Sequence, residues 1–157
     1  MRAPEGKVFG VDQLPFIDEH TQRIDALPEV VWAALSRMLR GMERARWWAR
    51  VLGCDPVTVT PGFSGQRGET VPGFRVAESE PGRRLALRGR HRFAHYALTF
   101  VFDGHQLRAL THAEFPGVLG KLYRTAVIGT GAHAVVTRRM LRKVATAASR
   151  RQEVRAP

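Results

Sequence analysis

The strongest constraint on the fold is an alternating segment that turns back on itself. Residues 95–115, "HYALTFVFDGHQLRALTHAEF", alternate apolar and polar side chains on both sides of Asp103-Gly104, a dipeptide typical of β-hairpin turns. Side chains two positions apart share one face of a strand, so the hairpin has a single inward face. That face carries Tyr96, Leu98, Phe100 and Phe102 before the turn, and Leu107, Ala109, Thr111 and Ala113 after it. The pattern predicts an antiparallel sheet.

Three further segments extend this sheet. Residues 83–93, "RRLALRGRHRF", place Leu85, Leu87 and His91 on one face and arginines on the other. A strand is expected over residues 74–78, and a polar-rich strand over residues 16–26.

The remaining apolar residues have helical spacing. Pro28 suits the first turn of a helix, and Val31, Leu35 and Leu39 then recur every four residues. After Gly41 a second short helix is expected to end at Gly53. Apolar residues from 118 to 144 predict one long C-terminal helix.

This order of elements predicts a single α+β domain. We expect a flexible N-terminal arm over residues 1–15, the domain over residues 16–149 and a basic tail over residues 150–157.

The segment 127–134, "VIGTGAHA", fits the G-x-G-x-x-A pattern of a dinucleotide-binding turn. That turn needs a strand before the first glycine and an acidic residue about 20 residues later. The residues before Gly129 already have helical spacing, and only 26 residues follow Gly131. We therefore reject nucleotide binding and expect the glycines to bend the helix or to let its backbone approach the sheet or a bound molecule. Close packing against the sheet is favoured over contact with a bound molecule.

The composition bears on the cellular location of the protein and on whether it holds a metal or a disulfide. No apolar run reaches the ~20 residues that span a bilayer, and the N-terminus lacks the apolar stretch of a secretory signal. The single cysteine, Cys54, permits neither an internal disulfide nor a multi-cysteine metal site. The six histidines show no metal-binding spacing. We expect a cytoplasmic protein without a metal or cofactor.

The net charge of +11 is concentrated in the C-terminal helix, where nine Lys or Arg accompany one acid from Gly117 onward. Cations at a helix C-terminus complement its dipole, which is the favoured explanation. Transient contact between this basic helix end and an anionic membrane is the alternative. Nucleic-acid binding rests on charge alone and is disfavoured. The sequence indicates no oligomeric state.

Residues 16–145 resemble the SRPBCC, or START-like, superfamily, which includes polyketide cyclase/dehydrase-like proteins and the birch-pollen allergen family. The resemblance is carried by the strand-to-helix junction "IDALPEVVW" and by the sheet-to-helix junction "FPGVLGKLYRTAVIG". It implies a helix-grip fold, in which a curved antiparallel sheet wraps around a long C-terminal helix and encloses an apolar cavity. Members bind lipids, sterols, polyketides or other hydrophobic small molecules, and some catalyse reactions on them.

The strand alternation supplies candidate residues for such a cavity. A ligand site of this kind needs a large apolar surface with a few polar groups, although the same apolar residues also describe a filled core. Polar residues on inward faces are more informative, because an unpaired buried polar group costs about 1–3 kcal/mol. His20, His91 and Tyr96 are the candidates for orienting a ligand, and structural hydrogen bonds are the alternative for each. The full set of candidate ligand-binding residues is His20, Gln22, Phe74, Leu87, His91, Tyr96, Leu98, Phe100, Thr111, Tyr123 and Val127.

No catalytic motif is present. The hypothesis that the protein is an enzyme therefore depends on acid–base pairs in the same cavity. His91 with Tyr96, or Asp18 with His20, would serve a cyclase- or dehydratase-like reaction. The sequence thus predicts a hydrophobic-ligand-binding helix-grip domain, with the enzyme and the basic-surface binder as alternatives.

Overall fold

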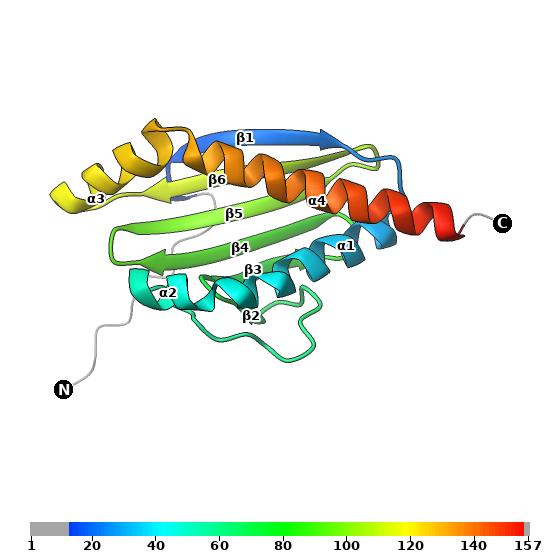
Figure 1. The fold of residues 1–157 in the computed structure, drawn as a ribbon, viewed down its shortest axis with the longest axis horizontal. Helices are drawn as coiled ribbons and strands as arrows, with labels where there is room; N and C mark the ends of the chain where they lie inside the picture. The colour runs from blue at the N-terminus through cyan, green and yellow to red at the C-terminus, as the bar shows by residue number, and fades with distance from the viewer. Residues whose placement is uncertain (1–12, 156–157) are drawn as a thin grey trace.

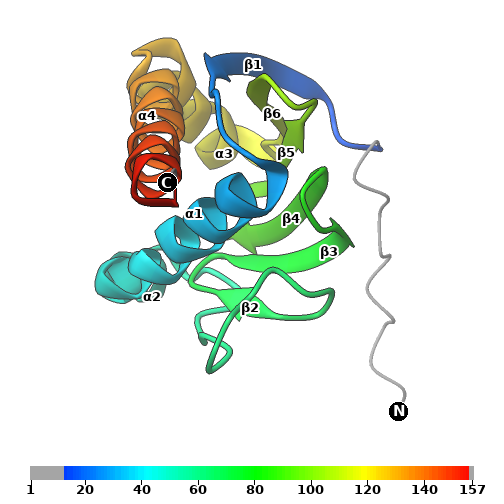
Figure 2. The same ribbon diagram turned by 90° about the vertical axis from the view of Figure 1, so that its right-hand side faces the viewer.

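The computed structural model describes residues 13–155, which form one antiparallel sheet with helices on one face (Figures 1 and 2). The six strands are ordered β1-β6-β5-β4-β3-β2. Their bounds are β1 (Phe16–Arg23), β2 (Thr70–Val71), β3 (Phe74–Glu80), β4 (Arg84–His91), β5 (Ala94–Phe102) and β6 (Gln106–Glu114). The predicted antiparallel sheet is therefore confirmed, with the first strand against the last.

The central hairpin has the register that its alternation predicts. Leu98 lies opposite Thr111 and Phe102 lies opposite Leu107. The Asp103 carboxylate accepts the backbone N–H groups of His105 and Gln106, at 3.0 and 2.8 Å, and so holds the turn closed.

Two longer helices lie side by side on the concave face of the sheet, α1 (Pro28–Arg40) and α4 (Ala132–Arg155) (Figure 2). After α1 come a 3₁₀ turn, η2 (Gly41–Ala45), and the short helix α2 (Arg46–Leu52). Gly53 ends α2 at φ 69°, in the left-handed region that favours glycine. The helix-grip architecture, with the two predicted helices α1 and α2 between the first strand and the rest of the sheet, is thus confirmed.

The C-terminal helix is broken, which corrects the expectation of one continuous helix. The chain forms α3 (Gly117–Arg124), a π-helical turn η3 (Thr125–Gly129) and then α4. Gly131 has φ 75°, and a Cβ atom there would meet nothing within 4 Å. Close packing was therefore wrong at Gly131. The other expected role, a bend in the helix, is the one found there, because the backbone conformation requires glycine.

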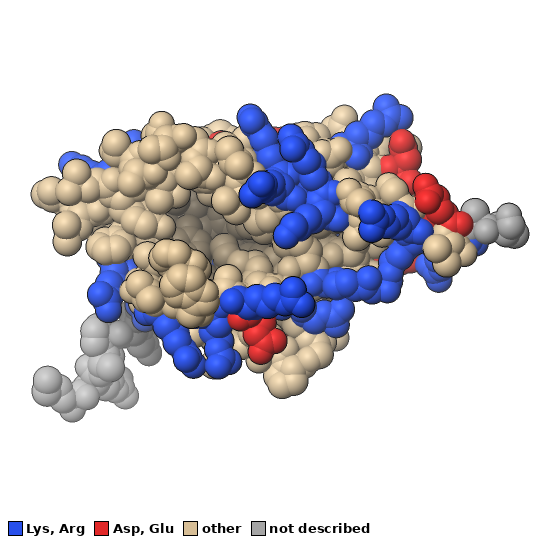
Figure 3. Space-filling model, in the orientation of Figure 1, with Lys and Arg blue, Asp and Glu red and all other residues tan. Residues whose placement is uncertain are grey.

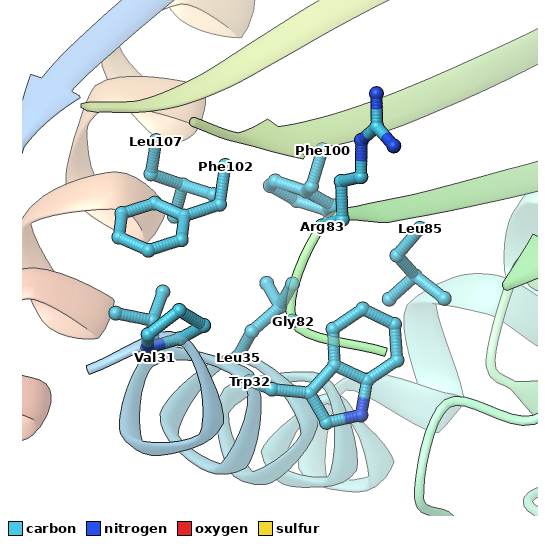
Figure 4. A pocket seen from close by; sticks show the side chains of 10 residues that line it. Val31, Trp32, Leu35, Gly82, Arg83, Leu85, Phe100, Phe102 and Leu107 are labelled. Atoms are coloured by element: carbon cyan, nitrogen blue, oxygen red, sulfur yellow. The ribbon is translucent and has the colours of Figure 1, made fainter. Parts of the chain in front are cut away.

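At the hairpin end, the space between the sheet and α1 is filled. Figure 4 shows Phe100 and Phe102 of β5 and Leu107 of β6 pointing toward Val31 and Leu35 of α1. The gap left among these side chains is ≈ 10 Å³, about enough for one water molecule.

Both ends of the described chain pack differently from the expected arm and tail. Residues 1–12 of the predicted arm lie outside the described residues, whereas Leu14 packs against Ala86 and Ala97 on the outer face of the sheet. At the other end, α4 continues to Arg155, through residues expected to be a tail. Within residues 13–155, no helix is long and apolar enough to cross a membrane.

Candidate functional site

A cavity of ≈ 300 Å³ lies at the other end of the same concave face. The sheet forms its floor, while α2 forms one wall and α3, η3 and the start of α4 form the other. Figure 3 shows the molecule hollowed on this face between these two groups of helices. Its principal sheet-derived lining residues are Phe74, His91, Ala94, Tyr96, Leu98, Thr111 and Ala113; those from the helices are Trp48, Ala49, Leu52, Tyr123, Val127, Ile128 and His133.

The floor of the cavity depends on a glycine opposite a tyrosine. Gly89 pairs with Tyr96 across β4 and β5, and a Cβ atom on Gly89 would lie 1.8 Å from the carbonyl oxygen of Gly73. Only glycine lets the backbone approach so closely. The Tyr96 hydroxyl donates a hydrogen bond of 2.8 Å to that same carbonyl, which fixes the ring in the cavity floor.

Tyr96 and Cys54 stay protonated at neutral pH. Burial, and then the nearby Cys54, raise the pKa of the Tyr96 hydroxyl far above its ordinary value. Burial also raises the pKa of the Cys54 thiol, whose Sγ lies 3.9 Å from the Tyr96 oxygen. These groups are hydrogen-bonding parts of the wall, and the thiol lacks the lowered pKa of a nucleophile.

His91 presents a donor to the cavity. Its Nδ1 accepts the backbone N–H of Phe93 at 3.1 Å, which leaves the proton of the neutral ring on Nε2. Burial lowers the pKa of His91, and His95 lowers it further, so the neutral form prevails at pH 7. The ring lies edge-on to Tyr123, with centroids 4.7 Å apart, in an aromatic cluster that also includes Phe93.

A second polar group joins the sheet to α4 beside the cavity. His133 Nε2 lies 3.0 Å from Thr111 Oγ1 and 3.5 Å from Asp18 Oδ1. Asp18 Oδ2 in turn lies 3.1 Å from His20 Nε2. Asp18 Oδ1 is buried without a hydrogen bond to the described residues.

These groups do not form a metal site. Within residues 13–155, no three His, Cys, Asp or Glu side chains are grouped so that they could hold a metal ion.

Seven of the eleven predicted ligand residues line the cavity: Phe74, His91, Tyr96, Leu98, Thr111, Tyr123 and Val127. The other four do not. Leu87 is completely buried in the core, and Phe100 belongs to the filled end under α1. His20 Nε2 lies 3.1 Å from Asp18 Oδ2, and the Gln22 side-chain amide donates to the exposed Arg23 carbonyl; neither residue lines the cavity.

Sequence reasoning missed the α2 wall and His133. Trp48, Ala49 and Leu52 line the cavity at the spacing of one helix face, which was the available signal. His133 and Thr137 are four residues apart on α4, and the Thr137 hydroxyl donates to the His133 carbonyl at 3.0 Å.

The comparisons with known proteins establish the fold. No protein-family model matches the chain, and no curated protein matches it. A solved protein from Rhodobacter sphaeroides has a TM-score of 0.52 at 21% identity, covering 83% of this chain and 90% of its own. Proteins from Mesorhizobium loti and Geobacillus kaustophilus both have a TM-score of 0.50, at 16% and 14% identity. They cover 85% and 84% of this chain, and 96% and 94% of their own. These similarities and the topology show a helix-grip fold, which the resemblance implied.

Proposed function

We propose that this helix-grip domain binds a hydrophobic small molecule, lipid-, polyketide- or sterol-like in character, in the cavity between the sheet and the helices. The observation that carries the proposal is the ≈ 300 Å³ cavity itself, lined mainly by apolar and aromatic side chains. This volume is at the lower end of the range of small-molecule sites, about 300–1,000 Å³. The filled space under α1 supports the same conclusion, because the sheet and helices pack tightly at one end only.

The lining supports an expected orientation for such a ligand. Its apolar body packs against Phe74, Leu98 and Ile128. A polar group on the ligand has two anchoring points, the N–H donor of His91 and the pair formed by Thr111 and His133. A ligand with one oxygen-bearing end and a hydrophobic remainder satisfies both requirements. The single cysteine, half-buried and protonated, supports our expectation of a cytoplasmic location.

Native mass spectrometry of the freshly purified protein tests this proposal. We expect an adduct of one small molecule per chain, released by solvent extraction and identified as a largely apolar compound. A protein that is empty, and that also takes up no member of an added panel of fatty acids, sterols and aromatic polyketides, contradicts the proposal.

The environment of His133 favours a second candidate, a cyclase- or dehydratase-like enzyme. The Nδ1 lone pair of His91 already accepts the Phe93 N–H, and the Tyr96 hydroxyl stays protonated, so neither group of this predicted pair is free to accept a proton. His133 lines the cavity and has an Asp18 carboxylate oxygen 3.5 Å from its Nε2, and a histidine beside a carboxylate is a common general base. If the protein turns over the extracted compound, His133→Ala should abolish turnover and only weaken binding. Unchanged turnover in His133→Ala excludes this mechanism.

A further inference from the structure

Two short helices at the cavity end of the molecule expose large apolar side chains. On α2 these are Trp47, Trp48 and Val51; on α3 they are Val118, Leu119 and Leu122, and each of the six is 55–76% exposed. The rings of Trp47 and Trp48 stack with centroids 4.2 Å apart, which keeps both indoles together at the surface. Figure 1 shows α2 and α3 at the same end of the molecule, away from the C-terminal end of α4. We refer to these six residues as the α2–α3 surface.

The charges on these helices all have one sign. Arg46 and Arg50 lie on α2, and Lys121 and Arg124 lie on α3; all four are exposed. Neither helix contains Asp or Glu. Each helix therefore interleaves apolar and cationic side chains over two turns.

The same helices form the rim of the cavity. Trp48 and Leu52 of α2 line one side of the cavity, and Tyr123 of α3 lines the other. In Figure 3, mostly uncharged side chains surround the left part of the hollow, and Lys and Arg side chains gather to its right.

We propose that the α2–α3 surface docks on an anionic lipid bilayer. Helices that lie in a membrane interface combine Trp, Leu and Val with Lys and Arg in this way: the apolar side chains enter the headgroup boundary and the cations meet lipid phosphates. Indole rings favour this boundary because they have an apolar body and a polar N–H. The uniform positive charge complements an anionic leaflet.

The C-terminal end of α4 lacks this combination. It carries Arg150, Arg151 and Arg155, but Val154 is its one strongly exposed large hydrophobic residue among those described. Charge alone gives weaker membrane binding than charge with buried apolar area. The membrane contact that was the alternative explanation of the basic helix end is therefore reassigned to the opposite end of the domain. Docked there, the domain would hold the rim of its cavity against the lipid.

Sedimentation with lipid vesicles tests the docking proposal without reference to any cavity ligand. We expect the protein to bind vesicles of phosphatidylcholine with phosphatidylglycerol, to bind pure phosphatidylcholine much more weakly, and to dissociate as salt rises. Tryptophan emission should shift to shorter wavelength on binding, because the exposed indoles leave water.

Matched variants locate the contact. Lys121→Gln with Arg124→Gln should weaken binding roughly 30-fold, from two surface cations removed. Leu119→Gln with Leu122→Gln should weaken it by at least about tenfold while leaving the charge unchanged. The controls are Arg150→Gln with Arg151→Gln, and Val154→Gln, which should stay within about twofold of the parent. All replaced side chains are exposed, and circular dichroism verifies that each variant is folded.

Three outcomes overturn the proposal. The first is no binding to the anionic vesicles. The second is an equal loss in the control variants, which assigns the attraction to overall charge or to the end of α4. The third is a vesicle-independent dimer that Leu119→Gln with Leu122→Gln abolishes, which assigns the surface to a second copy of the chain. Ligand uptake in solution is measured separately, so failure of docking leaves the cavity proposal standing.

Discussion

Thr111 Oγ1 of β6 lies 3.0 Å from His133 Nε2 of α4, and this contact links the sheet to the C-terminal helix beside the cavity. The chain bends at Gly131, immediately before α4, and α4 then packs against β1 and β6. Asp18 completes the group from β1. Three residues far apart in the sequence thus meet where a polar end of a ligand would lie.

Thr111→Val should destabilise the protein by about 1 kcal/mol, because it removes a buried hydroxyl and leaves His133 without this partner. Urea unfolding measures the change. The matched control is Thr146→Val, an exposed threonine on α4, which should have no effect beyond about 0.5 kcal/mol. Equal changes in the two variants would show that the Thr111–His133 contact contributes nothing.

Gly89→Ala should be strongly destabilising, by at least about 2 kcal/mol, since its methyl group would collide with the Gly73 carbonyl and with the Tyr96 ring. Gly41→Ala is the matched control: φ is −61° there, and a Cβ atom meets nothing within 4 Å. That variant should be neutral or about 0.5–1 kcal/mol more stable. Chemical denaturation measures the free energy of unfolding of both variants. If Gly89→Ala is as stable as the parent, the backbone at Gly89 does not approach the Gly73 carbonyl as closely as described.

The two glycines of "VIGTGAHA" should respond oppositely to alanine. Gly131→Ala forces a side chain into the left-handed region and should cost about 1–2 kcal/mol. Gly129→Ala adds a methyl group in ordinary contact with Thr125, within helical backbone, and should be neutral or stabilise by up to about 1 kcal/mol. Thermal unfolding measures the stability of the two variants. Similar effects of the two substitutions would contradict the conclusion that the bend requires glycine at position 131.

His91 should make the protein less stable in mild acid. Its pKa in the folded protein is below the ordinary value of 6.5, so the unfolded chain takes up the proton more readily. The stability that this provides is fully present above about pH 6.5 and is lost as the pH falls through the lowered pKa. His91→Gln should therefore lose less stability than the parent between about pH 7.5 and pH 5.5. His105→Gln, at the exposed hairpin turn, should keep the parental dependence; a His91→Gln profile identical to the parent would count against the burial of His91.

The parts of the fold that follow from local patterns could be predicted. Alternation around Asp103-Gly104 specified the hairpin and which of its side chains face inward, so Tyr96, Leu98 and Thr111 were correctly placed on the inward face. Helical spacing identified α1 and the C-terminal helical region. These features depend on residues close in sequence.

The cavity could be only partly predicted, because its boundary is set by how far apart the helices lie. Phe100 and Leu98 share a strand face, yet Phe100 lies under α1, where the space is filled, and Leu98 faces the hollow. The face of a strand does not indicate which part of it a helix covers. His133 was not predicted as a lining residue for a related reason. Its approach to Thr111 and Asp18 depends on the bend at Gly131.

The most direct test of the ligand-binding proposal is a titration of the neutral hydrophobic probe N-phenyl-naphthylamine into three proteins: the parent, Ala113→Leu and Ala126→Leu. Ala113 lies in the cavity wall, whereas Ala126 is exposed and lies outside the lining. If the cavity is the binding site, the parent should bind one probe per chain. Ala113→Leu should bind it at least about tenfold more weakly because the added side chain occupies the space, and Ala126→Leu should match the parent. Equal affinity in all three folded proteins, or no saturable binding in the parent, would contradict the account.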